Sequence, residues 1–381
     1  MTLLLTGGTG VLSSAVAETA LARGDAVTVI NRGNRRAIPQ CEQIVSDRHD
    51  YETIGRCLGD RHFDVAIDFL VFNRDDAASS FAFFSEKCDH YILISSCFAY
   101  DFSRPGPLRE NSPRGLSCWK YSIGKCEAED ELVRMGAHSN CKYTIVRPFV
   151  TYGNTRFPYS LAPEHGYGWT LIFRALAGKP IVTWNGGRDR CNIMRVEDFC
   201  TGLFGLLKNE NAYGEAVNIC GDESPCWRDV ISTLADVSGV KIPLIDLPRE
   251  FIQKHYPQRK EEIDGRSYEV FASNEKLKKL VPSFSSTISL RDGIARTVAS
   301  YRESNFQNGV DWTYDARCDE IINAWRRLQG QSGKMRFVNY LRNNRFESYA
   351  KYLNAMSGRG LGFRWYRKFV NAAARLARGW K

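Results

Sequence analysis

The feature that most constrains this chain is its opening stretch, TLLLTGGTGVLSS, residues 2–14. Its short apolar run is typical of a buried strand, and glycines separate that run from a helical pattern that begins at Val11. At such a turn the backbone N–H groups point outward, and the dipole of the following helix adds positive potential. The stretch therefore predicts a binding site for an anion, such as the diphosphate of a dinucleotide. A helix cap without a ligand is the alternative.

Ser13 is an irregularity in this motif, because a further glycine normally stands at its position and lets the helix pack closely on the strand. Gly7 and Gly10 remain to allow the tight turn and the close approach of a diphosphate. Serine is small, so we expect a modest packing cost and an intact nucleotide contact.

Strand and helix patterns alternate over the first 150 residues. Further strands are predicted at residues 26–30, 43–45, 64–69, 91–94 and 143–146, and helices at about 51–58, 76–87 and 120–135. This alternation predicts an α/β protein with a Rossmann doubly wound parallel sheet, helices on both faces and right-handed crossovers.

The alternation becomes irregular after residue 150. Residues 151–191 are rich in Pro, Gly and aromatic residues, as in loops that line a pocket, and residues 192–221 return to strand and helix character. We expect a dinucleotide-binding domain at 1–150 that 192–221 rejoins. A smaller mixed α/β substrate lobe would comprise 151–191 and 222–300, followed by a basic, aromatic C-terminal extension at 301–381.

Composition narrows the class of protein. No apolar run approaches the ~18 residues that a membrane span needs, and no signal-peptide pattern opens the chain. The 12 cysteines are scattered without a repeated CxxC spacing. We therefore expect a cytoplasmic protein with reduced thiols and no metal site.

The residues after the second predicted strand bear on the choice of dinucleotide. A fold of this kind places an acid there when it selects NAD(H), because the acid bonds the ribose 2′-hydroxyl and repels a 2′-phosphate. Here Asn31 and Arg32 occupy that place, with Arg35 and Arg36 close by, and arginine pairs well with phosphate. The sequence favours NADP(H), with NAD(H) possible and a solvated loop as the alternative. Asp47, after the third strand, could bond the adenine amino group; a simple turn residue is the alternative.

A hydroxyl, a phenol and an ammonium group are placed where proton transfer would need them. Tyr121 and Lys125 lie four residues apart on a predicted helix and share one face. An ammonium group favours the phenolate, so the tyrosine could exchange a proton near neutral pH. Ser96 ends a predicted parallel strand, where side chains point into the ligand crevice. Its neighbour Ser95 is the residue that could be confused with it.

Taken together, these motifs resemble the extended short-chain dehydrogenases/reductases of the NAD-dependent epimerase/dehydratase type. The matching stretches over residues 1–300 are TGGTGVLS at 6–13, the Ser96–Tyr121–Lys125 set, RPFVTYGN at 147–154, GGRDRCNIMRVEDF at 186–199 and NICGDE at 218–223. NRG at 31–33 and DRHD at 47–50 resemble the branch that includes chloroplast stem-loop binding proteins. Members of that branch commonly lack the Tyr–Lys pair, which this chain keeps.

The resemblance implies a role for each of the three residues. Tyr121 would be the acid/base and Ser96 would polarise the substrate oxygen. Lys125 would lower the pKa of the tyrosine and bond the nicotinamide ribose while hydride passes between a sugar carbon and the nicotinamide. A homodimer is also implied. The other implied cofactor-binding residues are Thr6, Gly7, Gly8, Thr9, Gly10, Val11, Leu12, Asn31, Arg32, Asp47, Phe69, Leu70 and Pro148.

Two departures from the family pattern affect the expected chemistry. Sugar 4,6-dehydratases carry an Asp-Glu pair directly after the hydroxyl residue, whereas Cys97 and Phe98 follow Ser96 here, so dehydration is disfavoured. Many epimerases have an asparagine shortly after the arginine that corresponds to Arg147, but this chain continues Pro-Phe-Val. The usual contact to the substrate diphosphate is therefore in doubt.

Arginines further along the chain could replace that contact. Arg188 and Arg195 are the predicted substrate-binding residues, together with Ser96, and Arg190 lies between them. The alternative is that these arginines form ion pairs with Glu197 and Asp198.

Basic charge is concentrated in the tail. Residues 331–381 contain twelve Lys or Arg and one acid, so the tail carries more than the whole net charge of +9. As a helix, residues 362–381 would be amphipathic, basic and aromatic. Three roles stay open: docking on the body or a second subunit, contact with an anionic membrane surface, or nucleic-acid binding.

The sequence thus predicts an NAD(P)-dependent oxidoreductase or epimerase that acts on a nucleotide-linked sugar or a similar polyol. An RNA-binding protein or a cofactor-sensing regulator on the same fold is the alternative. The retained Ser96–Tyr121–Lys125 set favours the enzyme. Reduction and epimerisation use the same three residues, so the sequence does not separate them.

Overall fold

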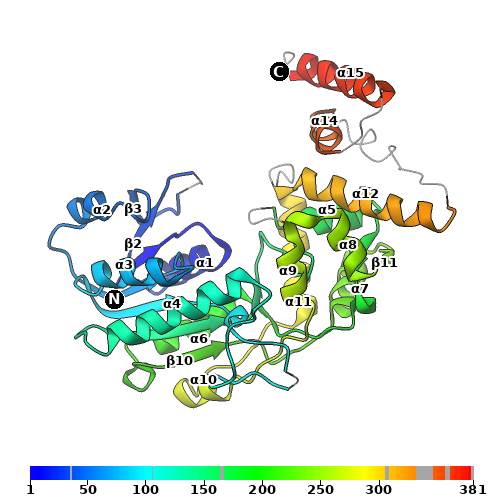
Figure 1. Cartoon of the computed structure of the whole chain (residues 1–381). Coiled ribbons are helices and arrows are strands. Elements are labelled where there is room, and N and C mark those ends of the chain that lie inside the picture. Colours follow the sequence, from blue (N-terminus) through cyan, green and yellow to red (C-terminus); the bar gives the residue numbers. More distant parts are fainter. Residues whose placement is uncertain are drawn as a thin grey trace. The chain divides into compact units, whose positions relative to one another are not determined.

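The computed structural model describes residues 1–34, 37–104, 106–163, 167–304, 309–331, 346–356 and 361–378 (Figure 1). It divides into two compact units. The first comprises Met1–Gly153, Asp189–Cys226 and Asp264–Gly293, and the second comprises Asn154–Arg188, Trp227–Ile263 and Ile294–Lys381. Residues 222–300 were expected to belong to a substrate lobe, whereas residues 222–226 and 264–293 belong to the first unit. The predicted extension, in turn, belongs to the second unit.

The first unit is built on a seven-stranded sheet in the order β10-β6-β5-β4-β1-β2-β3, and all six strand pairings are parallel. Its strands are β1 (Thr2–Thr6), β2 (Ala26–Asn31), β3 (Glu42–Val45), β4 (Phe63–Asp68), β5 (Cys88–Ile94), β6 (Lys142–Pro148) and β10 (Ala216–Ile219). The predicted Rossmann fold is confirmed. A short parallel pair, β7 (Val150–Tyr152) with β9 (Ile193–Arg195), completes the strands of this unit.

Helices cover both faces of the sheet because successive strand residues point to opposite sides. On β1, Leu3 and Leu5 join one apolar cluster and Leu4 joins the other. The first cluster packs against α1 (Val11–Ala22), α6 (Val196–Leu206) and α10 (Glu275–Leu280). The second packs against α2 (Tyr51–Leu58), α3 (Arg74–Phe84) and α4 (Lys120–Gly136).

The second unit is mainly helical, around a two-stranded parallel ladder. Its elements are α5 (Thr170–Leu176), β8 (Ile181–Thr183), α7 (Trp227–Ser238), β11 (Leu244–Asp246), α8 (Arg249–His255), α9 (Lys260–Gly265), α11 (Leu290–Glu303), α12 (Trp312–Leu328), α14 (Phe346–Ala355) and α15 (Leu361–Arg378). Within the described ranges, none of the helices is both long enough and apolar enough to span a bilayer.

A buried ion cluster holds the C-terminal helices to the rest of the second unit. The Arg174 guanidinium on α5 is fully buried and donates to the Asp315 backbone oxygen and to the Asp319 carboxylate on α12, each at 2.9 Å. Tyr352 on α14 donates to Asp319 at 2.7 Å. An apolar cluster that includes Trp312, Leu353 and Val370 continues the packing to α15. The extension therefore docks on its own chain.

Close packing at one glycine brings α4 against the loop after β4. A Cβ added to Gly124 would lie 2.5 Å from the backbone oxygen of Phe72, closer than any side chain could approach. The neighbouring residue, Lys125, is thereby held at the carboxyl edge of the sheet.

We predict that Gly124→Ala lowers the free energy of unfolding by about 1–3 kcal/mol, because the helix or the loop must move to admit a methyl group. Urea unfolding of the purified variant measures this. Gly55→Ala on α2 is the matched control, since its Cβ would meet Phe83 at an ordinary 3.6 Å; there the better helix propensity of alanine should leave stability equal or higher. Equal effects of the two substitutions would contradict the close-packing argument.

Candidate active site

The glycine-rich turn after β1 has a backbone that only glycine accommodates well. Gly7 and Gly8 have φ of 107° and 73°, and a Cβ on Gly8 would lie 2.9 Å from two atoms of the Val29 side chain. Gly7 N–H donates to the Ile30 oxygen at 2.7 Å. The turn therefore lies flat against β2 and leaves the first N–H groups of α1, from Val11 onward, without partners inside the helix.

Ser13 makes a hydrogen bond within the glycine-rich turn that was not predicted from the sequence. Its side chain is buried, and Oγ accepts a hydrogen bond from Gly10 N–H at 3.0 Å. The hydroxyl thus satisfies one of the donors at the start of α1. The residue that replaces the expected glycine stabilises the turn locally.

The loop after β2 holds the residues predicted to select the dinucleotide. Asn31 Oδ1 accepts from Gly33 N–H at 2.8 Å and from Gln43 Nε2 at 2.9 Å, which ties the loop to β3. Arg32 is exposed beside it. Asp47 is also exposed, and its carboxylate accepts from His49 N–H at 3.0 Å. Arg35 and Arg36 lie outside the described residues.

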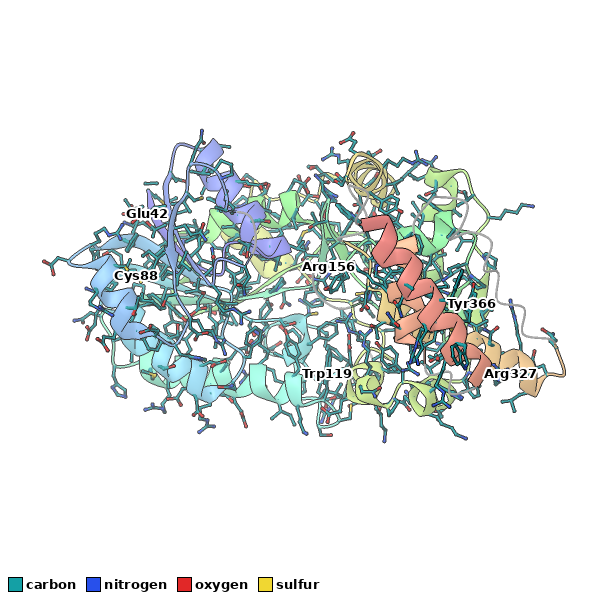
Figure 2. The ribbon with its side chains drawn as sticks, turned by 90° about the horizontal axis from the view of Figure 1, so that it is seen from above. Glu42, Cys88, Trp119, Arg156, Arg327 and Tyr366 are labelled. Atoms are coloured by element: carbon teal, nitrogen blue, oxygen red, sulfur yellow. The ribbon has the colours of Figure 1, made fainter. Side chains whose placement is uncertain are left out.

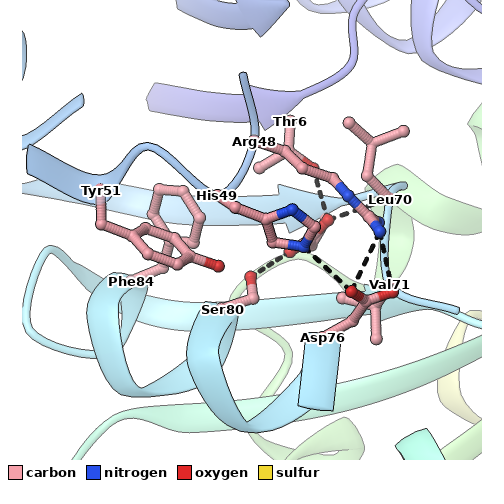
Figure 3. Close-up of a pocket in the computed structure, with 10 residues that line it drawn as sticks. Thr6, Arg48, His49, Tyr51, Leu70, Val71, Asp76, Ser80 and Phe84 are labelled. Atoms are coloured by element: carbon pink, nitrogen blue, oxygen red, sulfur yellow. Dashed lines mark hydrogen bonds and ion pairs between the residues drawn. The ribbon is translucent and has the colours of Figure 1, made fainter. Parts of the chain in front are cut away.

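A small pocket opens between the loop after β3 and the loop after β4 (Figure 3). Arg48 spans it and donates to both oxygens of Asp76 at 3.0 Å, and His49 Nε2 lies 3.0 Å from Asp76 Oδ1. Asp76 also accepts from Phe72 N–H at 2.9 Å. One carboxylate therefore joins the two loops.

A second carboxylate at this pocket, Asp68 at the end of β4, is buried and heavily hydrogen-bonded. It accepts from Tyr91 OH and from Leu70 N–H, each at 2.9 Å, and from the hydroxyls of Thr6 and Ser80. These bonds connect the glycine-rich turn to the loop that carries Phe69 and Leu70. Asp68, Asp76 and Arg48 were not predicted from the sequence. The acid at the end of an apolar strand, Asp68, was a signal that could have pointed to this pocket.

Lys125 is the best-defined member of the predicted catalytic set. Its buried Nζ donates to the Val71 oxygen at 2.6 Å and to the Ile94 oxygen at 3.2 Å, and lies 5.9 Å from the ring centre of Tyr121. Burial lowers the pKa of this ammonium from 10.5 to about 8, with Asp68 the largest opposing influence. An ammonium has three N–H donors; two make the bonds described, and Nζ also lies 4.9 Å from the ring centre of Phe72.

Aromatic contacts connect Tyr121 to the turn that carries Ser96. The ring centres of Trp119 and Tyr121 are 5.3 Å apart, and Phe98 lies 4.9 Å from Trp119, which Figure 2 labels. Ser96 is buried, and its Oγ accepts from Phe98 N–H at 3.1 Å. The short helical turn η1 (Cys97–Ala99) thus packs against α4.

The structure distinguishes the two adjacent serines. Ser95 Oγ donates to Glu129 Oε1 at 2.5 Å. The same carboxylate forms a buried ion pair with Arg147. Arg147 also donates to Tyr100 OH at 2.7 Å. Ser95 is therefore part of this structural network, whereas Ser96 lies beyond it at the strand end.

The predicted substrate arginines lie in different settings. Arg195 is buried, its Nε donates to Glu197 Oε2 at 2.9 Å, and its guanidinium covers the Tyr152 ring at 5.4 Å. This is the ion pair that the sequence analysis offered as the alternative. Arg188 is exposed and belongs to the second unit. Substrate contact by either arginine stays a prediction.

Asp198, the other acid proposed as an arginine partner, accepts instead from Thr287 Oγ1 at 2.9 Å and from Ile288 N–H at 3.0 Å. Pro148, predicted to contact the cofactor, ends β6 and is buried.

Residues 81–220 match the model of the NAD dependent epimerase/dehydratase family. The matched segment makes up 140 of the 381 residues. It is 25% identical over 333 residues, 82% of each chain, to the chloroplast stem-loop binding protein of 41 kDa b from Arabidopsis thaliana. It is 24% identical to a UDP-N-acetyl-alpha-D-glucosaminuronate decarboxylase from Bacillus cytotoxicus, covering 79% of this chain and 97% of the relative.

Solved structures agree on the fold. UDP-glucuronic acid 4-epimerase from Bacillus cereus, in complex with UDP-glucuronic acid and NAD, superimposes with a TM-score of 0.63 at 19% identity, over 80% of this chain and 99% of that one. UDP-glucose 4-epimerase from Thermotoga maritima gives a TM-score of 0.65 at 18% identity over the same shares.

The lowered pKa of Lys125 predicts a specific pH dependence of stability. Below about pH 8 both the native and the unfolded state hold this proton, and the burial penalty is present in full. Between about pH 8 and 10.5 the unfolded chain binds more protons, so the contribution of Lys125 to stability rises with pH. Between about pH 7.5 and 9.5, the free energy of unfolding of the wild type should therefore rise relative to that of Lys125→Met.

Urea unfolding at several pH values measures this difference. Lys120→Met, an exposed position on the same helix, controls for the loss of a charge. A difference between wild type and Lys125→Met that does not change with pH would show that the ammonium is solvated in the native state.

Proposed function

We propose that this protein binds a nicotinamide dinucleotide and catalyses hydride transfer at a carbon of a nucleotide-linked sugar or a similar polyol, as an epimerase or ketoreductase. The observation that carries this proposal is the buried Lys125 ammonium, held by the Val71 and Ile94 oxygens beside the Tyr121 ring. The names of the relatives, which include a UDP-sugar decarboxylase and an uncharacterized UDP-glucose epimerase from Bacillus subtilis, support the substrate class.

The residues present fit a dinucleotide. The tight turn at Gly7 and Gly8 supports a diphosphate at the start of α1, and the Lys125 ammonium suits a ribose hydroxyl. Exposed Arg32 at the end of β2, without an acid beside it, supports a preference for NADP(H) over NAD(H). When bound, the nicotinamide would supply a reversible hydride acceptor.

In the proposed reaction Tyr121 handles the proton. The nearby ammonium favours the phenolate, which takes the proton of a substrate hydroxyl as the carbon becomes a carbonyl. Ser96 would hydrogen-bond the same oxygen and hold it beside the phenol. Return of hydride to the opposite face of the sugar gives an epimer, and release of the dinucleotide after one transfer gives a net oxidation or reduction.

Elimination of water from the sugar is disfavoured by the residues after Ser96. Cys97 is buried, and burial raises the pKa of its thiol to about 12. Phe98 has no group that titrates. Neither residue supplies the acid and base that a dehydratase places here.

We expect Tyr121→Phe to lower kcat by about 10²–10⁴-fold, because the proton acceptor is lost, while the Kd of the dinucleotide changes less than about twofold. Turnover of UDP-sugars and a fluorescence titration with NADPH measure the two quantities. Tyr143→Phe, at the opposite end of β6 from the sheet edge that carries the site, is the control and should retain full activity. Full activity of Tyr121→Phe would refute the mechanism.

Arg32→Ala should weaken NADPH binding about tenfold to a hundredfold through loss of a charge-assisted phosphate contact, and leave NADH binding nearly unchanged. Titration with each dinucleotide tests this. Arg56→Ala, on the exposed surface of α2, controls for net charge. Equal losses for NADPH and NADH would refute the preference for NADP(H).

Native mass spectrometry of the freshly purified protein separates the candidate activities. A retained dinucleotide supports epimerisation, since hydride is then taken and returned in one site. An empty protein that binds NADPH supports a ketoreductase. A protein that binds neither dinucleotide but binds a nucleic-acid stem-loop would favour the activity named for the Arabidopsis relative.

A further inference from the structure

The last described helix, α15, has one side packed on its own chain and another side exposed. Val370 is 4% exposed and belongs to the apolar cluster formed with α12 and α14. Trp365 and Phe369, one turn apart, are each 70% exposed, and Tyr366, labelled in Figure 2, is 42% exposed. Contiguous exposed apolar side chains are typical of an interaction surface.

Cations lie directly beside these rings. Arg364 and Lys368 are exposed and also lie one turn apart, and Lys368 Nζ lies 5.6 Å from the ring centre of Trp365. The sequence of α15 contains five Lys or Arg and no Asp or Glu. The surface formed by Arg364, Trp365, Lys368 and Phe369, here called the α15 face, therefore combines apolar rings with positive charge.

We infer that the α15 face binds an anionic lipid membrane, with the helix lying in the plane of the interface. Rings of Trp and Phe insert at the boundary between headgroups and acyl chains, and neighbouring Lys and Arg extend toward anionic headgroups. A helix with five basic residues is too polar to cross the bilayer, in agreement with the absence of a spanning helix among the described residues.

Lipid fits the α15 face better than nucleic acid does. Proteins that bind single strands combine their rings with a groove that follows the backbone of the strand. Here the rings protrude from the outer side of a helix, and the next exposed residue on that side is Ala372, which offers no hydrogen bond. A convex apolar stripe with a basic border suits a flat interface.

The test is co-sedimentation of the full-length protein with vesicles, without substrate, so that the result is independent of the hydride-transfer proposal. We expect binding to phosphatidylcholine vesicles that contain about 30% phosphatidylglycerol, release at high salt, and little binding to phosphatidylcholine alone. Absent binding to the anionic vesicles, or equal binding to both kinds, would overturn the inference.

Variants locate the binding surface. Trp365→Ala/Phe369→Ala should lower the partition coefficient at least about tenfold, because the inserted rings are lost. Arg364→Gln/Lys368→Gln should lower it about 25-fold on anionic vesicles, at roughly fivefold per cation. Both pairs are exposed, so unchanged thermal unfolding is expected.

Two exposed positions near the end of α12 provide matched controls. Leu328→Ala removes a side chain that is 72% exposed, and Arg327→Gln removes an exposed cation; neither should change vesicle binding. Losses in these controls as large as those on α15 would overturn the assignment of the surface. Tighter binding of a single-stranded RNA than of anionic vesicles, abolished by the α15 variants, would overturn it in favour of a nucleic-acid surface.

Discussion

The arrangement of the candidate site depends on the close approach of α4 to the loop after β4. Gly124 permits this approach, since any side chain would meet the Phe72 backbone oxygen. The next residue, Lys125, then reaches the Val71 and Ile94 oxygens and carries its ammonium into a buried position. Without that approach the ammonium would be exposed to solvent.

Two buried carboxylates hold the other side of the site. Asp68 joins the glycine-rich turn to the loop after β4, and Asp76 joins that loop to the one after β3 through Arg48. A buried carboxylate is stable only when most of its lone pairs are satisfied, and each of these accepts several bonds. The pocket in Figure 3 therefore lies where three loops from different strands meet.

In the second unit, buried charges with partners also hold the C-terminal helices in place. The buried Arg174 guanidinium is neutralised by acids on α12, and Tyr352 brings α14 to one of them. Breaking such a cluster from one side leaves an uncompensated charge, which is far more destabilising than its absence. This anchoring holds α14 against α12, while Trp365 and Phe369 on α15 stay at the surface.

The sequence by itself determined the fold class, the glycine-rich turn, the placement of Tyr121 and Lys125 on one helix face, and the absence of an acid beside Arg32. These features are local, because strand and helix periodicities and i,i+4 spacing are written in short segments. The tertiary structure decided which serine binds Glu129, that Arg195 pairs with Glu197, and that Asp68, Asp76 and Arg48 meet at one pocket. It also returned residues 264–293 to the first unit. Those outcomes depend on strand order and burial, which are set by contacts between residues far apart in the chain.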